Sequence, residues 1–251
     1  MTCVSKERRP AKKGKYLHML KSYIAFDIET TGLSPEDNEI IEIGALKVQN
    51  GKVQERFMEF IKPKSSIPGN ITGLTGITNE MVREAGTVEQ VLPEFLRFCG
   101  SEILIGHNVL FDYSFVNISA GRLGCEFVKD GIDTLRIAKA VHSELPSRSL
   151  ESLCCHYHIE NTAAHRAYHD ALATAKLYQT LAHYFEEKAP EVFVPVPLVY
   201  KARQSPPATK KQLDFLARLT KQKGIQPVWN PETLTRGEAS KLIDGLLSGT
   251  N

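Results

Sequence analysis

The sequence contains no long hydrophobic run. No stretch of the chain approaches the ~18 consecutive apolar residues that a membrane-spanning helix needs, so we expect no membrane partner. Hydrophobic residues make up 42% of the 251 residues and charged residues 24%, which is typical of a soluble globular protein. A chain of this length has room for one well-packed domain of about 150–200 residues with smaller appendages.

Cysteines are few, and they are not spaced as disulfide partners or metal ligands usually are. The sequence contains five, an odd number, and no CxxC pair. A reduced intracellular compartment is the simplest interpretation. The run Cys-Cys-His-Tyr-His at 154–158 is spaced too tightly for tetrahedral zinc. Apolar residues around it repeat at helical spacing, which favours the end of a packed helix.

A cleavable leader peptide is not evident either. Residues 1–21 are basic, but the apolar residues among them are interrupted by His18 and Lys21, and no small-residue cleavage site follows. We therefore expect a cytoplasmic protein with a disordered basic arm over residues 1–20. A transit peptide would share this composition and stays open as an alternative.

The net charge is small, at +2, but it is unevenly distributed. Residues 1–21 carry a net +6, residues 22–198 a net −9 and residues 199–251 a net +5. An acidic centre between basic ends suits a metal–carboxylate site that the ends keep near a polyanion such as nucleic acid. For the N-terminal segment alone, a solubilising tail explains the charge equally well.

Two of the acidic residues lie in the most apolar strand pattern, Y-I-A-F-D-I-E-T-T-G at 23–32. Side chains alternate along a strand, so Asp27 and Glu29 point to the same face. At roughly 6.6 Å and an effective dielectric near 20, their charges repel by about 2.5 kcal/mol. A divalent cation between them would turn the repulsion into attraction. The alternative is a strand end that frays into water or pairs with lysines.

The remaining pattern indicates a mixed α/β sheet covered by helices. Apolar runs on both sides of Asn50-Gly51 predict a β-hairpin, hence three antiparallel strands near the start, and a short strand is expected at 102–106. The Gly- and Thr-rich segment 65–78 reads as a loop. Helical patterns cover about 78–84, 87–99, 111–121, 134–141, 149–156 and 167–187.

The chain is expected to divide into four parts. After the arm, an α/β domain occupies residues 21–189, followed by an extended proline-rich linker over 190–208. Residues 209–251 form a small helical pair, in which Thr209 with Gln212 and Thr235 with Glu238 each fit a capping box. About 40 residues are marginal for independent folding, so the pair is expected to pack on the main domain, on a partner or on nucleic acid.

Further candidates for chemistry follow Asp27 and Glu29 along the chain. Asp112 lies at the entry to a helix after an apolar strand, and His165 and Asp170 lie where the longest helix begins. Five residues apart on one helix, the last two would point about 140° apart. If His165 instead lies on the loop before the helix, both side chains can face one site.

These residues resemble a known family. The patterns D-x-E-T-T-G, H-N-x-x-F-D and H-x4-D, in this order and at these separations, resemble the three motifs of the DEDDh superfamily of 3′–5′ exonucleases, which includes the proofreading (epsilon) subunit of bacterial DNA polymerase III. The segment I-T-G-L-T-G-I-T-N-E-M-V also resembles part of the proofreading domain of Gram-positive-type replicative polymerases. The resemblance covers about residues 21–188.

The resemblance implies a ribonuclease H-like fold, a mixed five-stranded sheet flanked by helices, and two Mg²⁺ or Mn²⁺ ions. Carried over residue by residue, Asp27, Glu29 and Asp170 bind the first ion. Asp27 also reaches the second ion, which Asp112 binds through water. Hard oxygen ligands without cysteine suit these ions, and two ions roughly 3.5–4 Å apart can stabilise both the attacking and the leaving oxygen.

His165 is implied as the general base that takes the proton from the attacking water, a role suited to a side chain that exchanges protons near neutrality. The tyrosine variant of the superfamily has its tyrosine four residues before the last aspartate. Arg166 occupies that position here and Tyr168 is out of register, so the histidine type is favoured.

The same resemblance suggests contacts with the 3′-terminal nucleotide. The backbone near two threonines would receive the terminal hydroxyl, a leucine would wedge against the terminal base, a phenylalanine would pack beneath the site, and two residues would begin a loop beside the metals. These residues are Thr30, Thr31, Leu33, Phe111, His107 and Asn108. Ordinary turn and packing roles explain them equally well.

We therefore predict a metal-dependent 3′–5′ exonuclease that releases nucleoside 5′-monophosphates from a DNA end, in proofreading or DNA repair. An exoribonuclease that trims RNA or oligonucleotides is the alternative within the enzyme class, because a pocket's shape, not its catalytic residues, senses the 2′-hydroxyl. A catalytically silent module that tethers nucleic acid or a polymerase is the alternative outside it. A separate polymerase or clamp is an expected partner of the C-terminal segment.

Overall fold

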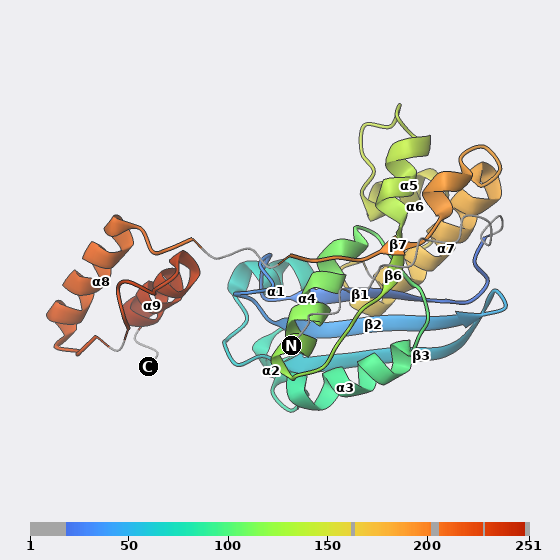
Figure 1. The fold of residues 1–251 in the computed structure, drawn as a ribbon. Coiled ribbons are helices and arrows are strands. Elements are labelled where there is room, and N and C mark those ends of the chain that lie inside the picture. Colours follow the sequence, from blue (N-terminus) through green and yellow to red (C-terminus); the bar gives the residue numbers. More distant parts are fainter. Residues whose placement is uncertain (1–18, 162–163, 202–205, 228, 249–251) are drawn as a thin grey trace, which may run out of the picture.

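The computed structural model describes residues 19–161, 164–201, 206–227 and 229–248 (Figure 1). The predicted basic arm falls almost wholly on residues 1–18, which lie outside the described residues. Its last two residues, Met19 and Leu20, pack against the hydrophobic core. The Leu20 amide donates a hydrogen bond to the Tyr178 hydroxyl at 3.0 Å. The first described residues are therefore tied to the folded domain.

A mixed sheet of seven strands forms the centre of the molecule, in the order β4-β3-β2-β1-β5-β6-β7. The first three strands are antiparallel neighbours, and β5 and β6 continue the sheet parallel to β1. The strands are β1 Tyr23–Thr30, β2 Ile40–Gln49, β3 Lys52–Lys62, β4 Gly86–Thr87, β5 Leu104–Gly106, β6 Asp130–Asp133 and β7 Val196–Pro197.

The predicted hairpin between β2 and β3 is confirmed. Asn50 and Gly51 both have positive φ angles, 52° and 77°, the backbone of a two-residue type I′ turn. The tight turn fixes the register, so Gln49 pairs with Lys52 and the two strands remain paired to Glu42 and Phe60.

The number of strands differs from the five predicted. The two additional strands, β4 and β7, are each two residues long and lie at the two edges of the sheet. Two residues cannot show an alternating pattern, and β7 contains Pro197, which sequence reasoning places in extended linkers. The five longer strands form the predicted mixed sheet.

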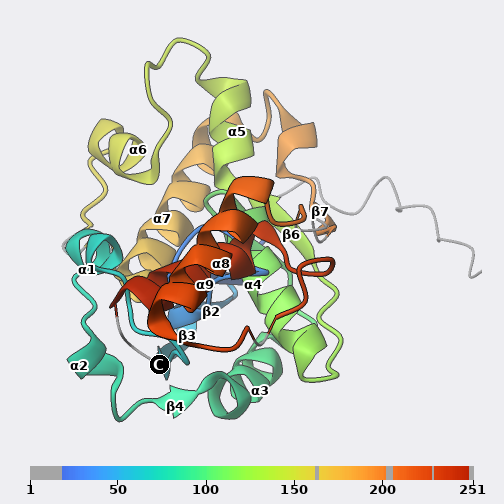
Figure 2. The same ribbon diagram turned by 90° about the vertical axis from the view of Figure 1, so that its left-hand side faces the viewer.

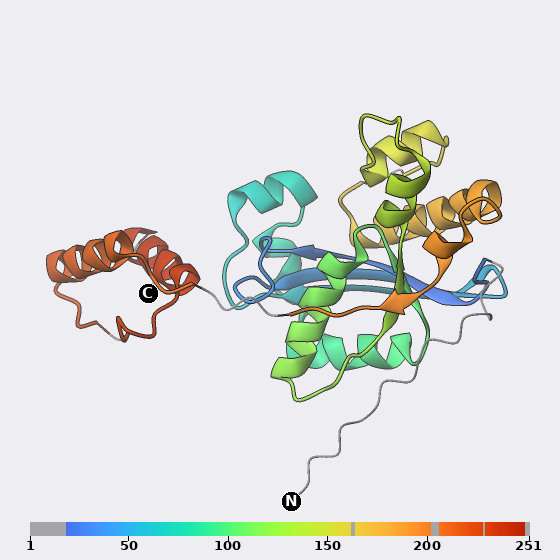
Figure 3. The same cartoon turned by 45° about the horizontal axis from the view of Figure 1, so that its top comes forward.

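Helices cover both faces of the sheet (Figure 3). The helices α5, α6 and α7 lie on one side, where α7 packs on β1 and β2, and α3 and α4 lie on the other. The bounds are α1 Gly69–Thr75, α2 Asn79–Val82, α3 Val88–Cys99, α4 Val109–Arg122, α5 Thr134–Val141, α6 Leu150–His156, α7 Ala167–Phe185, α8 Lys210–Lys223 and α9 Arg236–Ser248, with a 3₁₀ turn η1 at Pro190–Phe193.

The expectation of a loop over 65–78 is wrong for its central part, where the chain forms helix α1. Its sequence, G-N-I-T-G-L-T, shows no apolar stripe and contains two glycines, so its pattern gives no helical signal. The helix ends at Gly76, whose φ of 72° provides a left-handed C-cap. The Thr75 hydroxyl donates to the Ile71 carbonyl at 3.0 Å, and Ile71 packs on a small core of its own with Ile67 and Ile77.

The chain continues along the sheet after α7. The backbone of β7 pairs with β6, and Leu198 donates its N–H to the Lys129 carbonyl at 2.8 Å. Leu198 is buried against Gly131, where a Cβ atom would lie 2.7 Å from the leucine side chain. The first part of the expected linker, up to Tyr200, therefore packs on the sheet, whereas the division into domains stays a prediction.

Helices α8 and α9 lie side by side (Figure 2). They share a small core of Leu216, Leu219, Leu234, Ala239 and Leu246. Both predicted capping boxes are present, since Thr209 and Thr235 exchange hydrogen bonds with Gln212 and Glu238. Lys241 donates a hydrogen bond to the Asp37 carbonyl in the turn after β1. Within the described residues, no helix has both the length and the apolarity needed to cross a membrane.

Candidate active site

The site begins on β1, the strand that is paired on both sides. Asp27 and Glu29 lie opposite Gly44 and Glu42 of β2. Directly opposed residues of antiparallel strands share a face, so three carboxylates and one glycine line the same side of the sheet. Three acidic side chains on one face of two strands are unfavourable unless something of opposite charge lies among them.

Gly44 lets helix α7 approach this face closely. A Cβ atom at Gly44 would lie 1.9 Å from the Tyr168 backbone nitrogen and 2.2 Å from the Ala167 carbonyl carbon. The first turn of α7 therefore lies directly on the backbone of β2. This contact places Asp170, in the same turn, beside the carboxylates of β1.

Asp27, Glu29 and Asp170 come together as a group that could bind a metal ion. One carboxylate oxygen from each lies within 4.8 Å of the others. Burial and then the charges of Asp112, Asp170, Glu29 and Glu42 raise the pKa of Asp27 well above its usual value. The pKa of Glu29 rises to about 8, first through burial and then through Asp170 and Glu42. The three carboxylates repel one another when they are ionised. A divalent cation, which prefers hard oxygen ligands, would remove that repulsion.

Asp112 reaches the same region from the start of α4. Its Oδ1 accepts a hydrogen bond from the Ile28 N–H at 3.1 Å. Strand β5 pairs with β1 only at Ile24 and Ala25, so the carboxylate occupies the free edge of β1 beyond β5. Asp112 is 4% exposed, and burial raises its pKa well above the usual range. The sequence placed it correctly at a helix entry.

His165 lies on the turn before α7, as the loop alternative in the sequence predicted. Its φ is +63°, and its side chain is exposed. The His165 N–H donates to Asp170 Oδ2 at 2.9 Å, while Asn161 donates to Asp170 Oδ1 at 2.7 Å. The turn and the aspartate are therefore connected through the backbone, and the imidazole stays available at the surface of the site.

An ion pair that the sequence analysis missed joins β2 to the start of α7. Arg166 donates to Glu42 through Nη2 at 2.9 Å and through Nε at 3.3 Å. Glu42 Oε2 also accepts the Ala167 N–H at 3.1 Å. The Arg166 guanidinium lies 5.2 Å from the centre of the Phe60 ring. Glu42 therefore fixes the junction between the turn that carries His165 and the start of α7.

Three of the residues expected near the 3′ end of a substrate lie where β1 ends: Thr30 is the last residue of the strand, and Thr31 and Leu33 lie on the turn that follows it. The Thr30 hydroxyl donates to the Gly32 carbonyl at 2.6 Å, and the Thr31 hydroxyl accepts the Glu39 N–H at 2.9 Å. Both threonines are buried, while Leu33 is 84% exposed. The threonine side chains thus shape the turn, and the leucine extends from it into solvent.

The other three residues lie around the start of α4. His107 is held by Thr134 and the Arg148 carbonyl, each at 2.9 Å, and burial lowers its pKa. Asn108 has a φ of 68° and donates its N–H to Asp133 at 2.8 Å. Phe111 packs on Phe115, with ring centres 5.1 Å apart. Both ring nitrogens of His107 are engaged, so this residue shapes the loop rather than facing the carboxylates.

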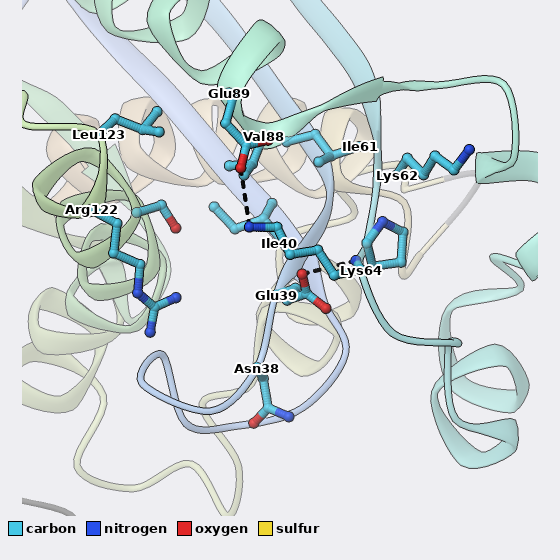
Figure 4. A pocket seen from close by; sticks show the side chains of 12 residues that line it. Asn38, Glu39, Ile40, Ile61, Lys62, Lys64, Val88, Glu89, Arg122 and Leu123 are labelled. Carbon is cyan, nitrogen blue, oxygen red and sulfur yellow. Dashed lines mark hydrogen bonds and ion pairs between the residues drawn. The ribbon is translucent and has the colours of Figure 1, made fainter. Parts of the chain in front are cut away.

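A hollow of about 190 Å³ elsewhere on the surface has different chemistry (Figure 4). Lys64 pairs with Glu89 at 3.1 Å, and Glu39 accepts the backbone N–H groups of Lys64 and Ser65. The charges of Lys64 and Glu89 therefore pair with each other, and backbone amides bind the Glu39 carboxylate. Among the described residues, none of the predicted site residues lines this hollow, so the acidic cluster remains the candidate site.

The fold and the cluster define a ribonuclease H-like exonuclease architecture, and comparison with solved structures agrees. An exonuclease X in complex with 5′ overhanging duplex DNA matches 68% of this chain and 99% of its own, with a TM-score of 0.56 and 23% identity. Exonuclease I matches 69% of this chain and 42% of its own, with a TM-score of 0.59 and 21% identity. At these identities the likeness shows the fold alone.

The chain belongs to the RNase T exonuclease family, whose model, described as "Exonuclease", matches residues 24–178. It is similar to DNA polymerase III PolC-type of Caldanaerobacter subterraneus subsp. tengcongensis, with 39% identity over 165 residues. The PolC-type polymerase of Halalkalibacterium halodurans is 41% identical over 156 residues. These stretches cover 66% and 62% of this chain but only 12% and 11% of the two relatives.

Proposed function

We propose that this protein is a metal-dependent 3′–5′ exonuclease that releases nucleoside 5′-monophosphates from DNA. The observation that carries the proposal is the meeting of Asp27, Glu29 and Asp170 within 4.8 Å, in a chain of the exonuclease family. Burial and then repulsion among these carboxylates raise the pKa of Asp27 and Glu29, which supports a resident cation.

The residues that would bind two Mg²⁺ or Mn²⁺ ions are Asp27, Glu29 and Asp170, with Asp112 completing the second position. Bound ions would neutralise the carboxylates and stabilise charge that develops on the attacking and leaving oxygens. His165, exposed on its turn, accepts the proton from the attacking water. Asn161 and the His165 backbone orient Asp170, and Ile28 orients Asp112, through the hydrogen bonds described above.

We further propose that the protein acts in the cytoplasm in proofreading or repair, and works with a polymerase or a clamp. The relatives that support this are PolC-type polymerases, of which the chain matches about an eighth. The net positive charge of residues 199–251 supports a contact of the C-terminal segment with nucleic acid or with such a partner.

The test is a nucleotide-release assay on matched DNA and RNA oligonucleotides labelled at either end, with Mg²⁺, with Mn²⁺ and with a chelator. We expect metal-dependent release of mononucleotides from the 3′ end, faster on DNA and faster still from a mismatched 3′ end. Faster release from RNA would favour the exoribonuclease. Binding without any metal-dependent release would favour the silent module.

A further inference from the structure

A hollow of about 420 Å³ lies between the turn that follows β1 and the start of α4. Leu33 on its rim comes four residues after Glu29, and Phe111 on its wall directly precedes Asp112. The hollow therefore lies at the end of β1 that carries Glu29 and at the first turn of α4, whose Asp112 accepts the Ile28 N–H. Its size is within the range of about 300–1,000 Å³ that small-molecule sites usually have.

The walls of the hollow favour an uncharged ring over a phosphate. Leu33 and Leu110 are exposed by 84% and 42%, and they share the lining with Phe111 and Tyr200. Single exposed leucines are ordinary, but here two border one hollow with two aromatic rings. Among the described residues that line it there is no lysine or arginine, and Glu36 supplies a carboxylate. That carboxylate would repel a phosphate group.

Tyr200 comes from outside the residues that match the family model, which end at 178. Pairing of β7 with β6 brings the chain back across the sheet, and Leu198 anchors it in the core. The Tyr200 hydroxyl donates to Glu36 Oε1 at 2.8 Å. The backbone near Leu198 and the hydroxyl bond to Glu36 therefore hold the Tyr200 ring in place before any ligand binds, which lowers the entropic cost of binding.

We propose that Tyr200 is a substrate-contacting residue that forms, with Leu33 and Leu110, a site for a nucleobase within the last two nucleotides at the 3′ end of the substrate. The proposal rests on the proposed exonuclease function, because it is a phosphate at the acidic cluster that places the base at this hollow. Aromatic contact with a base tolerates any of the bases, since each has a π-face.

The test compares Tyr200→Ala, Tyr200→Phe and Val199→Ala in the full chain. Val199 is the matched control, because it neighbours Tyr200 in the same segment and is 61% exposed. Each variant is assayed for kcat and KM on DNA oligonucleotides that are intact, abasic at the last nucleotide or abasic at the next-to-last. Thermal unfolding of each variant checks the fold.

We expect Tyr200→Ala to raise KM on intact DNA about five-fold or more, as removal of an aromatic platform does. Tyr200→Phe should raise KM less than Tyr200→Ala does, because it keeps the ring and loses only the hydrogen bond to Glu36. Val199→Ala should stay near the parent. On the oligonucleotide that lacks the contacted base, the Tyr200→Ala effect should disappear, and this arm identifies which nucleotide is bound.

An equal effect of Tyr200→Ala on all three oligonucleotides would overturn the proposal, since it would show a purely structural role. No effect on any of them, with an active parent, would overturn it as well while leaving the exonuclease function intact. A parent that releases no nucleotide would contradict the exonuclease function and the base site together.

Discussion

Asp27 is the residue on which the electrostatics of the site converge, because four other carboxylates raise its pKa in addition to its burial. We expect Asp27→Asn to lower nucleotide release by more than about a hundredfold. Even removal of a residue that only hydrogen-bonds to a metal ligand lowers metal affinity or activity by about 10–100-fold. The same change removes a repelled charge, so in chelator its thermal stability should equal or exceed that of the parent. Release at the parental rate in Mg²⁺ would show that the site lies elsewhere.

Glu29 makes the stability of the metal-free protein depend on pH. Its pKa is about 8 in the folded chain, above the 4.5 of an ordinary glutamate, so the folded state binds a proton that the unfolded state has lost. The stability that this proton contributes is present below pH 4.5 and lost as the pH rises through 8. In chelator, we expect the melting temperature to fall between about pH 5 and pH 8.

Glu29→Gln should flatten this part of the profile, and saturating Mg²⁺ should reverse the loss in the parent, since a metal binds the deprotonated carboxylates. Melting curves measured in chelator and in Mg²⁺ across this range would check both. A parental profile in chelator that is flat or rises from pH 5 to 8 would contradict the assigned direction.

The Glu42–Arg166 ion pair predicts an asymmetric effect of mutation. Arg166→Gln leaves the buried Glu42 carboxylate without its charged partner. Removal of one member of a buried pair costs about 3–5 kcal/mol. The arginine side chain is 36% exposed, so water screens the pair and we expect about 2 kcal/mol.

The double variant Glu42→Gln/Arg166→Gln should regain part of that loss, because no charge is then left unpaired. Urea unfolding of the two single variants and the double variant gives the coupling energy. Strictly additive effects would mean that the pair contributes nothing.

The sequence predicts those site residues that belong to a short motif, and it does not predict those whose place depends on the pairing of distant segments. Asp27, Glu29, Asp112 and Asp170 stand in short patterns with recognisable neighbours, and the structure brings three of them together and the fourth next to them. Glu42 gave no such signal, because its place opposite Glu29 depends on the register between two strands.

At the scale of elements, Gly44 decides how closely α7 lies on the sheet. A methyl group there would meet the backbone of Tyr168 at 1.9 Å, and backbone cannot yield as a flexible side chain does. We expect Gly44→Ala to destabilise the protein by about 3 kcal/mol. It should also lower nucleotide release, because α7 would carry Asp170 away from β1.

Gly121→Ala in α4 is the matched control, since a Cβ atom there meets nothing within 4 Å. It should be neutral or stabilising by up to about 1 kcal/mol. Urea unfolding and the release assay check both variants. A Gly44→Ala protein as stable as the control variant would contradict the close approach of α7.

The elements that sequence reasoning located carry their own signals: the Asn50-Gly51 turn, the apolar stripe of α7 and the two capping boxes. The elements that it did not locate, α1, β4, β6 and β7, have no such signal. Helix α1 lacks an apolar stripe, while β4 and β7 exist only because a longer strand offers them a free edge.

At the scale of the whole molecule, the central sheet and the C-terminal helical pair differ in how many side chains they bury. Strands β1 and β2 lie inside the sheet and bury most of their residues. Among the described residues, α8, α9 and the segment between them share a core of only five buried side chains. In hydrogen exchange we expect the amides of α8 and α9 to exchange well before those of β1 and β2. Exchange of both sets at one common rate would instead show a single cooperative unit.

The return of the chain along β6 has a practical consequence for anyone who shortens this protein. A fragment cut at residue 178, where the family likeness stops, or at the end of α7, would lose Phe193, Leu198 and the whole of β7. The outer edge of β6 would then offer its free backbone groups to a strand of another copy, which favours self-association of the fragment.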